Sequence, residues 1–107
     1  MDENKKQRLK EAGWRTGSVA EFLELTPEEN EIIELRLALS KAVRNRRLEI
    51  SLTQQAAAKK LGTSQSRLAK MEKGDPSVSF DLLIHSLFGL GIDKHKLSQL
   101  IIEGSRG

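Results

Sequence analysis

Residues 53–74 have the sequence TQQAAAKKLGTSQSRLAKMEKG, which predicts two short helices joined by a tight turn. Thr53 can cap the first helix, because its hydroxyl can accept an amide proton of the first turn. Ala57 and Leu61 are four residues apart and therefore share one helix face. Gly62 follows at the point where the chain must leave the helix through the left-handed region, which costs glycine little.

The second helix of this stretch has an apolar side and a polar side. Either Thr63 or Ser64 can cap it. Leu68 and Met71 are three residues apart on its inner face, and Gly74 ends it. Its outer side carries short hydrogen-bonding groups and cations that suit base edges and phosphates, namely Ser64, Gln65, Ser66, Arg67, Lys70 and Lys73.

This stretch resembles the helix-turn-helix of the Xre family, which the lambdoid phage repressors share. Gln54 matches the residue that opens the first helix, Ala58 the small residue where the two helices approach, and Gly62 the turn. Leu68 and Met71 match the buried positions of the second helix, and Glu72-Lys73-Gly74 matches its end. Thr63 departs from the aliphatic residue usual after the turn, although its methyl group partly substitutes. The resemblance covers about residues 36–92 and implies an all-α, five-helix, lambda-repressor-like DNA-binding domain. The alternative is a helical hairpin of an unrelated bundle.

The composition indicates one small domain without cysteine chemistry. The chain has 107 residues and no cysteine, which excludes a disulfide framework and a cysteine metal site. No apolar run approaches the roughly 18 residues that a membrane span needs, and residues 1–6 do not resemble a signal peptide. We expect a soluble, cytoplasmic protein that needs no cofactor and no membrane.

The net charge of +3 is ordinary, but the charge is distributed unevenly along the chain. Residues 41–73 hold nine basic residues and two acidic ones, a net charge of +7. Residues 11–40 hold two basic residues and seven acidic ones, a net charge of −5. The basic segment coincides with the two predicted helices, as phosphate binding requires. A merely solvated face would predict no such coincidence.

Two helices are predicted upstream of the motif. Residues 18–21 carry a capping-box pattern, which favours a short helix over residues 19–25. Thr26 as the cap and Pro27 in the first helical position start a longer helix that runs to about Leu48. Steps of three and four residues place one stripe of side chains along it, made of Ile32, Leu35, Leu39, Val43 and Arg47.

Two more helices are predicted after a loop over residues 75–78. Ser79 can cap the first, whose expected inward residues are Phe80, Leu83, Ile84, Leu87 and Phe88. Asp93 can cap the second, over about residues 94–103, whose apolar residues are Leu97, Leu100 and Ile101. No strand-like alternation stands out. The chain thus divides into an N-terminal extension, residues 1–25, and a helix-turn-helix DNA-binding domain, residues 26–107.

The resemblance also assigns roles to side chains, because the first residues of the second motif helix enter the major groove in the resembling repressors. The expected base contacts are Gln65, Ser66 and Lys70. The expected phosphate contacts are Gln54, Ser64, Arg67 and Lys73. For Gln65 the alternative is an ordinary solvated polar residue.

Arg47 and Glu72 occupy positions that form a pair in many members of the resembling family. Glu72 follows Met71 on the inner side of its helix, where an isolated carboxylate would be costly. We expect the pair to hold the recognition helix against the long preceding helix. The alternative is two exposed charges.

An enzyme is not expected. His85 and His95 are ten residues apart, with no cysteine and no close cluster of carboxylates at metal-ligand spacing. We expect His85 at the edge of its helix and His95 in the first turn of the last helix. The sequence therefore assigns neither a catalytic residue nor a metal ligand.

The N-terminal residues carry a shorter resemblance to HigA-type antitoxins. It rests on Gly13-Trp14, Gly17, Phe22-Leu23-Glu24-Leu25-Thr26 and Glu28-Glu29. It implies a repressor of its own operon that also neutralises an RNase toxin, whose basic surface the acidic half could complement. The alternatives are a solitary repressor without a toxin and an interaction module whose basic helix meets an acidic protein.

A homodimer on a double-stranded DNA operator is expected, because one recognition helix touches too few base pairs for specificity in a genome. The candidate dimer surface combines the last predicted helix with the end of the helix before it. Its apolar residues are Leu90, Ile92, Leu97, Leu100 and Ile101. Core packing of these residues is the alternative.

Overall fold

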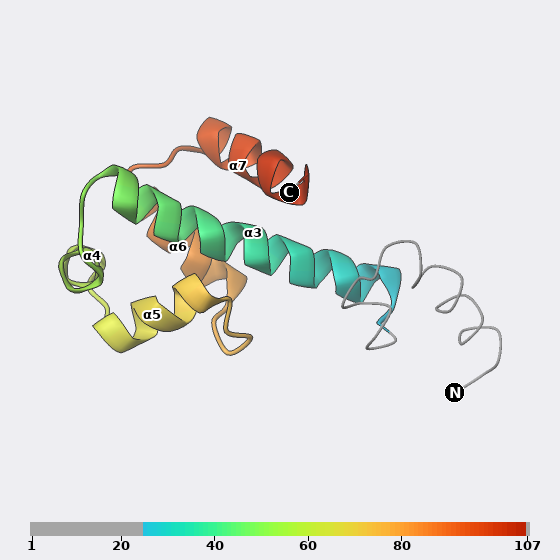
Figure 1. The fold of residues 1–107 in the computed structure, drawn as a ribbon, viewed down its shortest axis with the longest axis horizontal. Helices are drawn as coiled ribbons and strands as arrows, with labels where there is room; N and C mark the ends of the chain where they lie inside the picture. Colours follow the sequence, from blue (N-terminus) through green and yellow to red (C-terminus); the bar gives the residue numbers. More distant parts are fainter. Residues whose placement is uncertain (1–24, 107) are drawn as a thin grey trace. The chain divides into compact units, whose positions relative to one another are not determined.

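The computed structural model describes residues 25–106, with side chains up to residue 103. Five helices lie in this range (Figure 1): α3 (Pro27–Glu49), α4 (Gln54–Leu61), α5 (Gln65–Lys73), α6 (Phe80–Gly89) and α7 (Lys94–Arg106). Residues 25–106 contain no strand, so the expected all-α fold is confirmed. The predicted helix over residues 19–25 and the N-terminal extension lie outside the described residues, apart from Leu25.

The chain divides into two compact units, Met1–Ile33 and Glu34–Gly107. In the first unit, the described residues are the start of α3. Thr26 Oγ1 accepts a hydrogen bond from the Glu29 amide, and Glu29 Oε1 accepts one from the Thr26 amide, both at 3.1 Å. This reciprocal capping box, with Pro27 as the first helical residue, confirms the predicted helix start.

The second unit buries one apolar core between α3, α4, α5 and α6. Its central side chains are Leu39, Val43, Ala57, Leu68, Met71, Leu83 and Leu87. The predicted stripe of α3 joins this core from Leu35 onward, whereas Ile32 is exposed.

Helices α4 and α5 form the helix-turn-helix. Thr53 Oγ1 accepts a hydrogen bond from the Ala56 amide at 3.0 Å and so caps α4. Gly62 has a φ of 70° and ends α4, as predicted. Ser64, and not Thr63, caps α5, since its Oγ accepts a bond from the Arg67 amide at 3.0 Å. Figure 1 looks along α4 while α5 lies across the view, so the two helices cross steeply.

Helix α6 packs against α4 and turns Leu83, Ser86 and Leu87 toward the core. Phe88 was predicted to point inward but is exposed. It lies one residue beyond Leu87, and one residue is a rotation of about 100° around a helix of 3.6 residues per turn. That rotation moves its ring off the inner face.

The end of α6 is held against α3. Leu90 and Ile92 are buried in the core, and Arg46 Nε donates to the Leu90 carbonyl at 2.8 Å. These two side chains are therefore not available for a dimer contact, and that part of the expected dimer surface is wrong. Both residues follow the end of α6, where the chain folds back over the core. The sequence pattern alone does not predict this fold-back.

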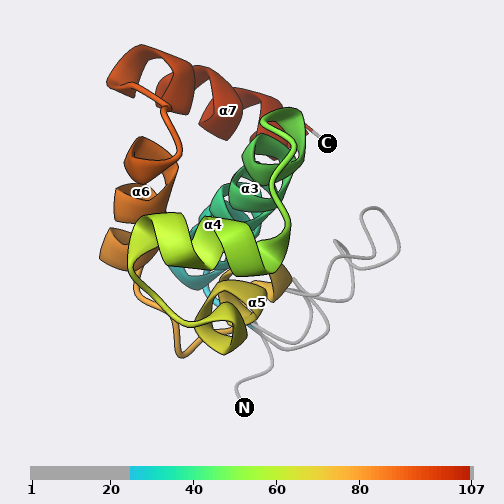
Figure 2. The same cartoon turned by 90° about the vertical axis from the view of Figure 1, so that its left-hand side faces the viewer.

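Helix α7 begins after Asp93, whose Oδ1 accepts a bond from the Lys96 amide at 2.8 Å. In both views it lies beside the C-terminal half of α3 (Figures 1 and 2). Leu97, Leu100 and Ile101 are partly buried against the core, whereas Ile102 is 56% exposed. None of the helices within residues 25–106 is long and apolar enough to cross a membrane.

Candidate nucleic-acid interface

The polar face of α5 is exposed. Leu68 and Met71 on the opposite face are 0% exposed, which fixes how the helix is turned about its axis. The other face exposes every expected contact residue of α5, namely Gln65, Ser66, Arg67, Lys70 and Lys73. The cap residue Ser64 is exposed beside them. Core packing thus presents hydrogen-bonding groups and cations together on one surface.

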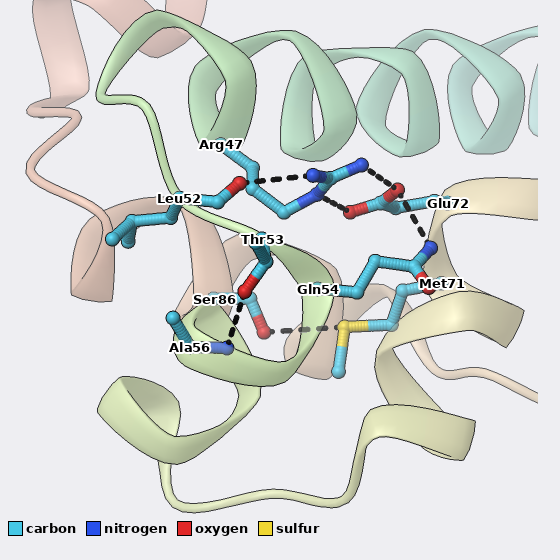
Figure 3. A network of polar contacts seen from close by, with 8 residues as sticks. All are labelled: Arg47, Leu52, Thr53, Gln54, Ala56, Met71, Glu72 and Ser86. Atoms are coloured by element: carbon cyan, nitrogen blue, oxygen red, sulfur yellow. Dashed lines mark hydrogen bonds and ion pairs between the residues drawn. The ribbon is translucent and has the colours of Figure 1, made fainter.

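The end of α5 is bound to the end of α3 through Arg47 and Glu72 (Figure 3). Arg47 Nε and Nη2 donate to the two carboxylate oxygens of Glu72 at 2.6 and 3.0 Å. Nη1 donates to the Leu52 carbonyl at 3.0 Å. The two side chains are only 10% and 4% exposed. The hydrogen bonding of Arg47 to the Glu72 carboxylate raises the pKa of Arg47 above its ordinary value, so the charge on the guanidinium is stabilised.

Gln54 joins this pair from the start of α4. Its Nε2 donates to Glu72 Oε1 at 3.1 Å, the oxygen that also accepts from Arg47. The amide of Gln54 has two N–H groups, so one remains beyond the bond to Glu72. Gln54 was expected to contact a phosphate, and the structure places it, half-buried, against Glu72. The network connects α3, α4 and α5 at one point.

A second buried contact joins α5 to α6. Ser86 Oγ donates to Met71 Sδ at 3.3 Å, and both side chains are buried (Figure 3). This contact and the Arg47–Glu72 pair hold the inner side of α5 at two adjacent residues, Met71 and Glu72. The exposed face of α5 is therefore carried on a rigid support, which is what a surface that discriminates between ligands requires.

A hollow of about 670 Å³ opens beside the first turns of α5. It lies between α5, the following loop and α6. Its polar lining residues are Ser64, Ser66, Arg67, Lys70, Ser77, Ser79, Asp81 and His85. The sequence interpretation used Ser79 only as a helix cap and assigned His85 no role. Nothing in the sequence spacing places these two residues beside Arg67, because the approach of α6 to α5 is a tertiary contact.

The loop between α5 and α6 is ordered by Asp75. Its Oδ1 accepts a hydrogen bond from the Ser77 amide at 2.8 Å. This bond lowers the pKa of the Asp75 carboxyl below its ordinary value, because it favours the charged form. The Val78 carbonyl at the end of the loop accepts a bond from Arg36 Nη1, and the Arg36 guanidinium lies 4.6 Å from the centre of the Phe80 ring.

The described part of the chain offers little evidence for a metal site or a catalytic site. Residues 25–103 contain no group of three or more histidine or carboxylate side chains placed to hold a metal ion. His85 on α6 and His95 on α7 are both exposed, and His95 Nε2 lies 3.4 Å from Gln99 Nε2.

Residues 43–84 match a helix-turn-helix family. The matched segment contains the whole of α4 and α5, the end of α3 and the first half of α6. A match of this kind indicates a DNA-binding regulator of transcription and, typically, a domain without catalytic activity. No curated protein and no solved structure matches the chain.

Proposed function

We propose that this protein is a sequence-specific transcriptional repressor that binds a double-stranded DNA operator with α5. The observation that carries the proposal is the exposed polar and cationic face of α5, which lies on a buried support inside the segment that matches the helix-turn-helix family. A helix of this kind fits the major groove of B-DNA, where base edges present a distinct pattern for each base pair.

The proposed roles follow the chemistry of each side chain. Gln65 reads adenine through paired donor and acceptor groups, Lys70 reaches guanine acceptors, and Ser66 bonds a nearby base. Ser64, Arg67 and Lys73 bind phosphates at the edges of the groove. Gln54 binds a phosphate with the N–H group that does not bond Glu72, so the buried pair would also orient this contact.

A selection from a pool of random duplexes tests the proposal directly. The purified protein should enrich a short, pseudo-palindromic sequence, and that duplex should bind far more tightly than a scrambled one. Enrichment of no sequence, together with binding to an acidic protein, would instead favour the interaction module. The same protein with Gln65, Ser66 and Lys70 replaced by alanine provides the control, because these exposed substitutions leave the core intact.

The repressor is proposed to bind DNA as a two-fold homodimer. Two recognition helices related by a dyad would read half-sites about 34 Å apart, one turn of B-DNA. Helix α7 supplies the best surface for this contact, because Ile102 is exposed and the neighbouring Leu97 and Ile101 are only partly buried. The end of α6 cannot contribute, since Leu90 and Ile92 belong to the core.

A finer proposal is that the repressor is the antitoxin of a toxin–antitoxin pair in the bacterial cytoplasm. It rests on the resemblance of residues 13–29 to HigA-type antitoxins and on the division into an extension, residues 1–25, and a DNA-binding domain, residues 26–107. The neighbouring gene decides it. A small adjacent gene whose product stops growth, and is neutralised by this protein, supports the antitoxin. A neighbour without that effect supports the solitary repressor.

A further inference from the structure

The hollow between α5 and α6 brings together groups that bind anions. Arg67 and Lys70 reach it from α5, and His85 reaches it from α6. Arg67, Lys70 and His85 are all exposed, so a ligand from solvent can approach them. Among the described residues, Asp81 is the one acidic side chain in its lining. Two cations and an imidazole therefore face one carboxylate there.

Hydroxyl groups complete this lining. Ser64 Oγ accepts a bond from the Arg67 amide at 3.0 Å, and Ser79 Oγ accepts one from the Leu82 amide at 3.1 Å. A hydroxyl that accepts a backbone bond still has its own hydrogen to donate. Ser64 and Ser79 lie in the wall of the hollow, so both can donate to a ligand there. The chemistry of donors and cations together fits the oxygens of a phosphate.

We propose that the hollow binds a phosphate of the DNA backbone and that Ser79 and His85 contact it. This inference rests on the proposed function. The phosphate would belong to the strand beside α5, because Ser66 and Lys70 line the hollow and also lie on the face assigned to bases. The DNA contact would thus extend from the recognition helix onto α6.

The decisive experiment measures binding of the selected duplex by fluorescence anisotropy. His85→Ala should bind about tenfold more weakly, the loss of one hydrogen bond to the phosphate. His95→Ala removes an exposed histidine from α7 and should behave as the wild type.

A second variant changes the affinity in the opposite direction. Asp81→Asn removes the one carboxylate in the lining and should tighten binding by about threefold to tenfold, because a like charge no longer faces the phosphate. Glu31→Gln on α3 removes an exposed acid elsewhere and is the matched control. Circular dichroism of each variant checks that the helices are retained.

The outcomes separate the two proposals. A wild-type protein that binds no duplex specifically overturns the proposed function. A wild type that binds specifically while His85→Ala binds equally well overturns the phosphate site in the hollow alone. Binding of inorganic phosphate that shifts the His85 ring signals in NMR, without any effect of His85→Ala on DNA affinity, also overturns it, since the ligand would then be a free anion.

Discussion

The Arg47–Glu72 contact connects α3 to α5 through one pair of side chains. Both groups are nearly buried, and Glu72 also receives the Gln54 amide. Removing one partner leaves the other charge without compensation in a site that water hardly reaches. The pair is thus a condition for the fold of the recognition helix, and it is also close to a proposed DNA contact.

We expect Glu72→Ala to lower the free energy of unfolding by about 3–5 kcal/mol, measured by urea denaturation. Glu49→Ala is the control, because Glu49 forms an exposed pair with Arg46 at 3.6 Å and should cost at most about 1 kcal/mol. A double-mutant cycle with Arg47→Ala should show strong coupling to Glu72. Independent effects would mean that the pair does not hold α5 in place.

Gln65 and Lys73 lie on the same exposed helix face and should nevertheless respond differently. Gln65→Ala should cost about 1–3 kcal/mol on the preferred duplex and relax the preference at one base pair. Lys73→Ala should weaken binding to every sequence and reduce the logarithmic salt slope by about one. Anisotropy on matched and mismatched duplexes separates these effects. Equal losses on specific and scrambled DNA for both variants would refute base recognition by Gln65.

At the scale of the helices, predictions based on local chemistry were the reliable ones. The caps Thr53, Ser79 and Asp93, and the left-handed Gly62, depend only on neighbouring residues, and all four were predicted. Phe88 was wrong because its orientation depends on which face of α6 meets the core. A short apolar run such as Leu87-Phe88 contains no signal for that choice.

The candidate site also has a part that local sequence predicts and a part that it does not. The exposed face of α5 was predictable, because its polar residues follow the period of one helix. The hollow was not, because it forms only when α6 brings Ser79 and His85 beside Arg67. The bond from Gln54 to Glu72 was missed for the same reason, since it connects residues eighteen positions apart. Spacing along one helix predicts a face, and contacts between helices require the fold.

The turn between α4 and α5 gives a prediction for one element. Gly62 has a φ of 70°, and a Cβ added there would meet no atom within 4 Å. Gly62→Ala should therefore cost only the left-handed backbone strain, about 1–2 kcal/mol of unfolding free energy. Gly62→Asn should cost less, since asparagine tolerates this conformation. Thermal denaturation of the two variants compares them, and a cost for asparagine equal to that of alanine would contradict the strain account.

At the scale of the whole molecule, the proposed repressor has to distinguish one operator in a genome. One copy of α5 would read only a few base pairs, so in this proposal the specificity comes from two copies held at a fixed spacing. The contact between copies would have to leave both recognition helices free. Helix α7 meets this requirement, because its residues up to 103 take no part in the face of α5 or in the hollow.

We therefore expect Ile102→Glu to yield a folded monomer. Ile102 is 56% exposed, so a charge there disturbs an intermolecular contact and not the core. Sedimentation should show a monomer, circular dichroism should be unchanged, and affinity for a two-half-site duplex should fall on the order of 100-fold, since linked binding is lost. Leu100→Glu is the contrasting variant. Leu100 packs partly against the core, so a charge there should destabilise the fold as well. An Ile102→Glu protein that remains a dimer would place the contact between copies on another surface.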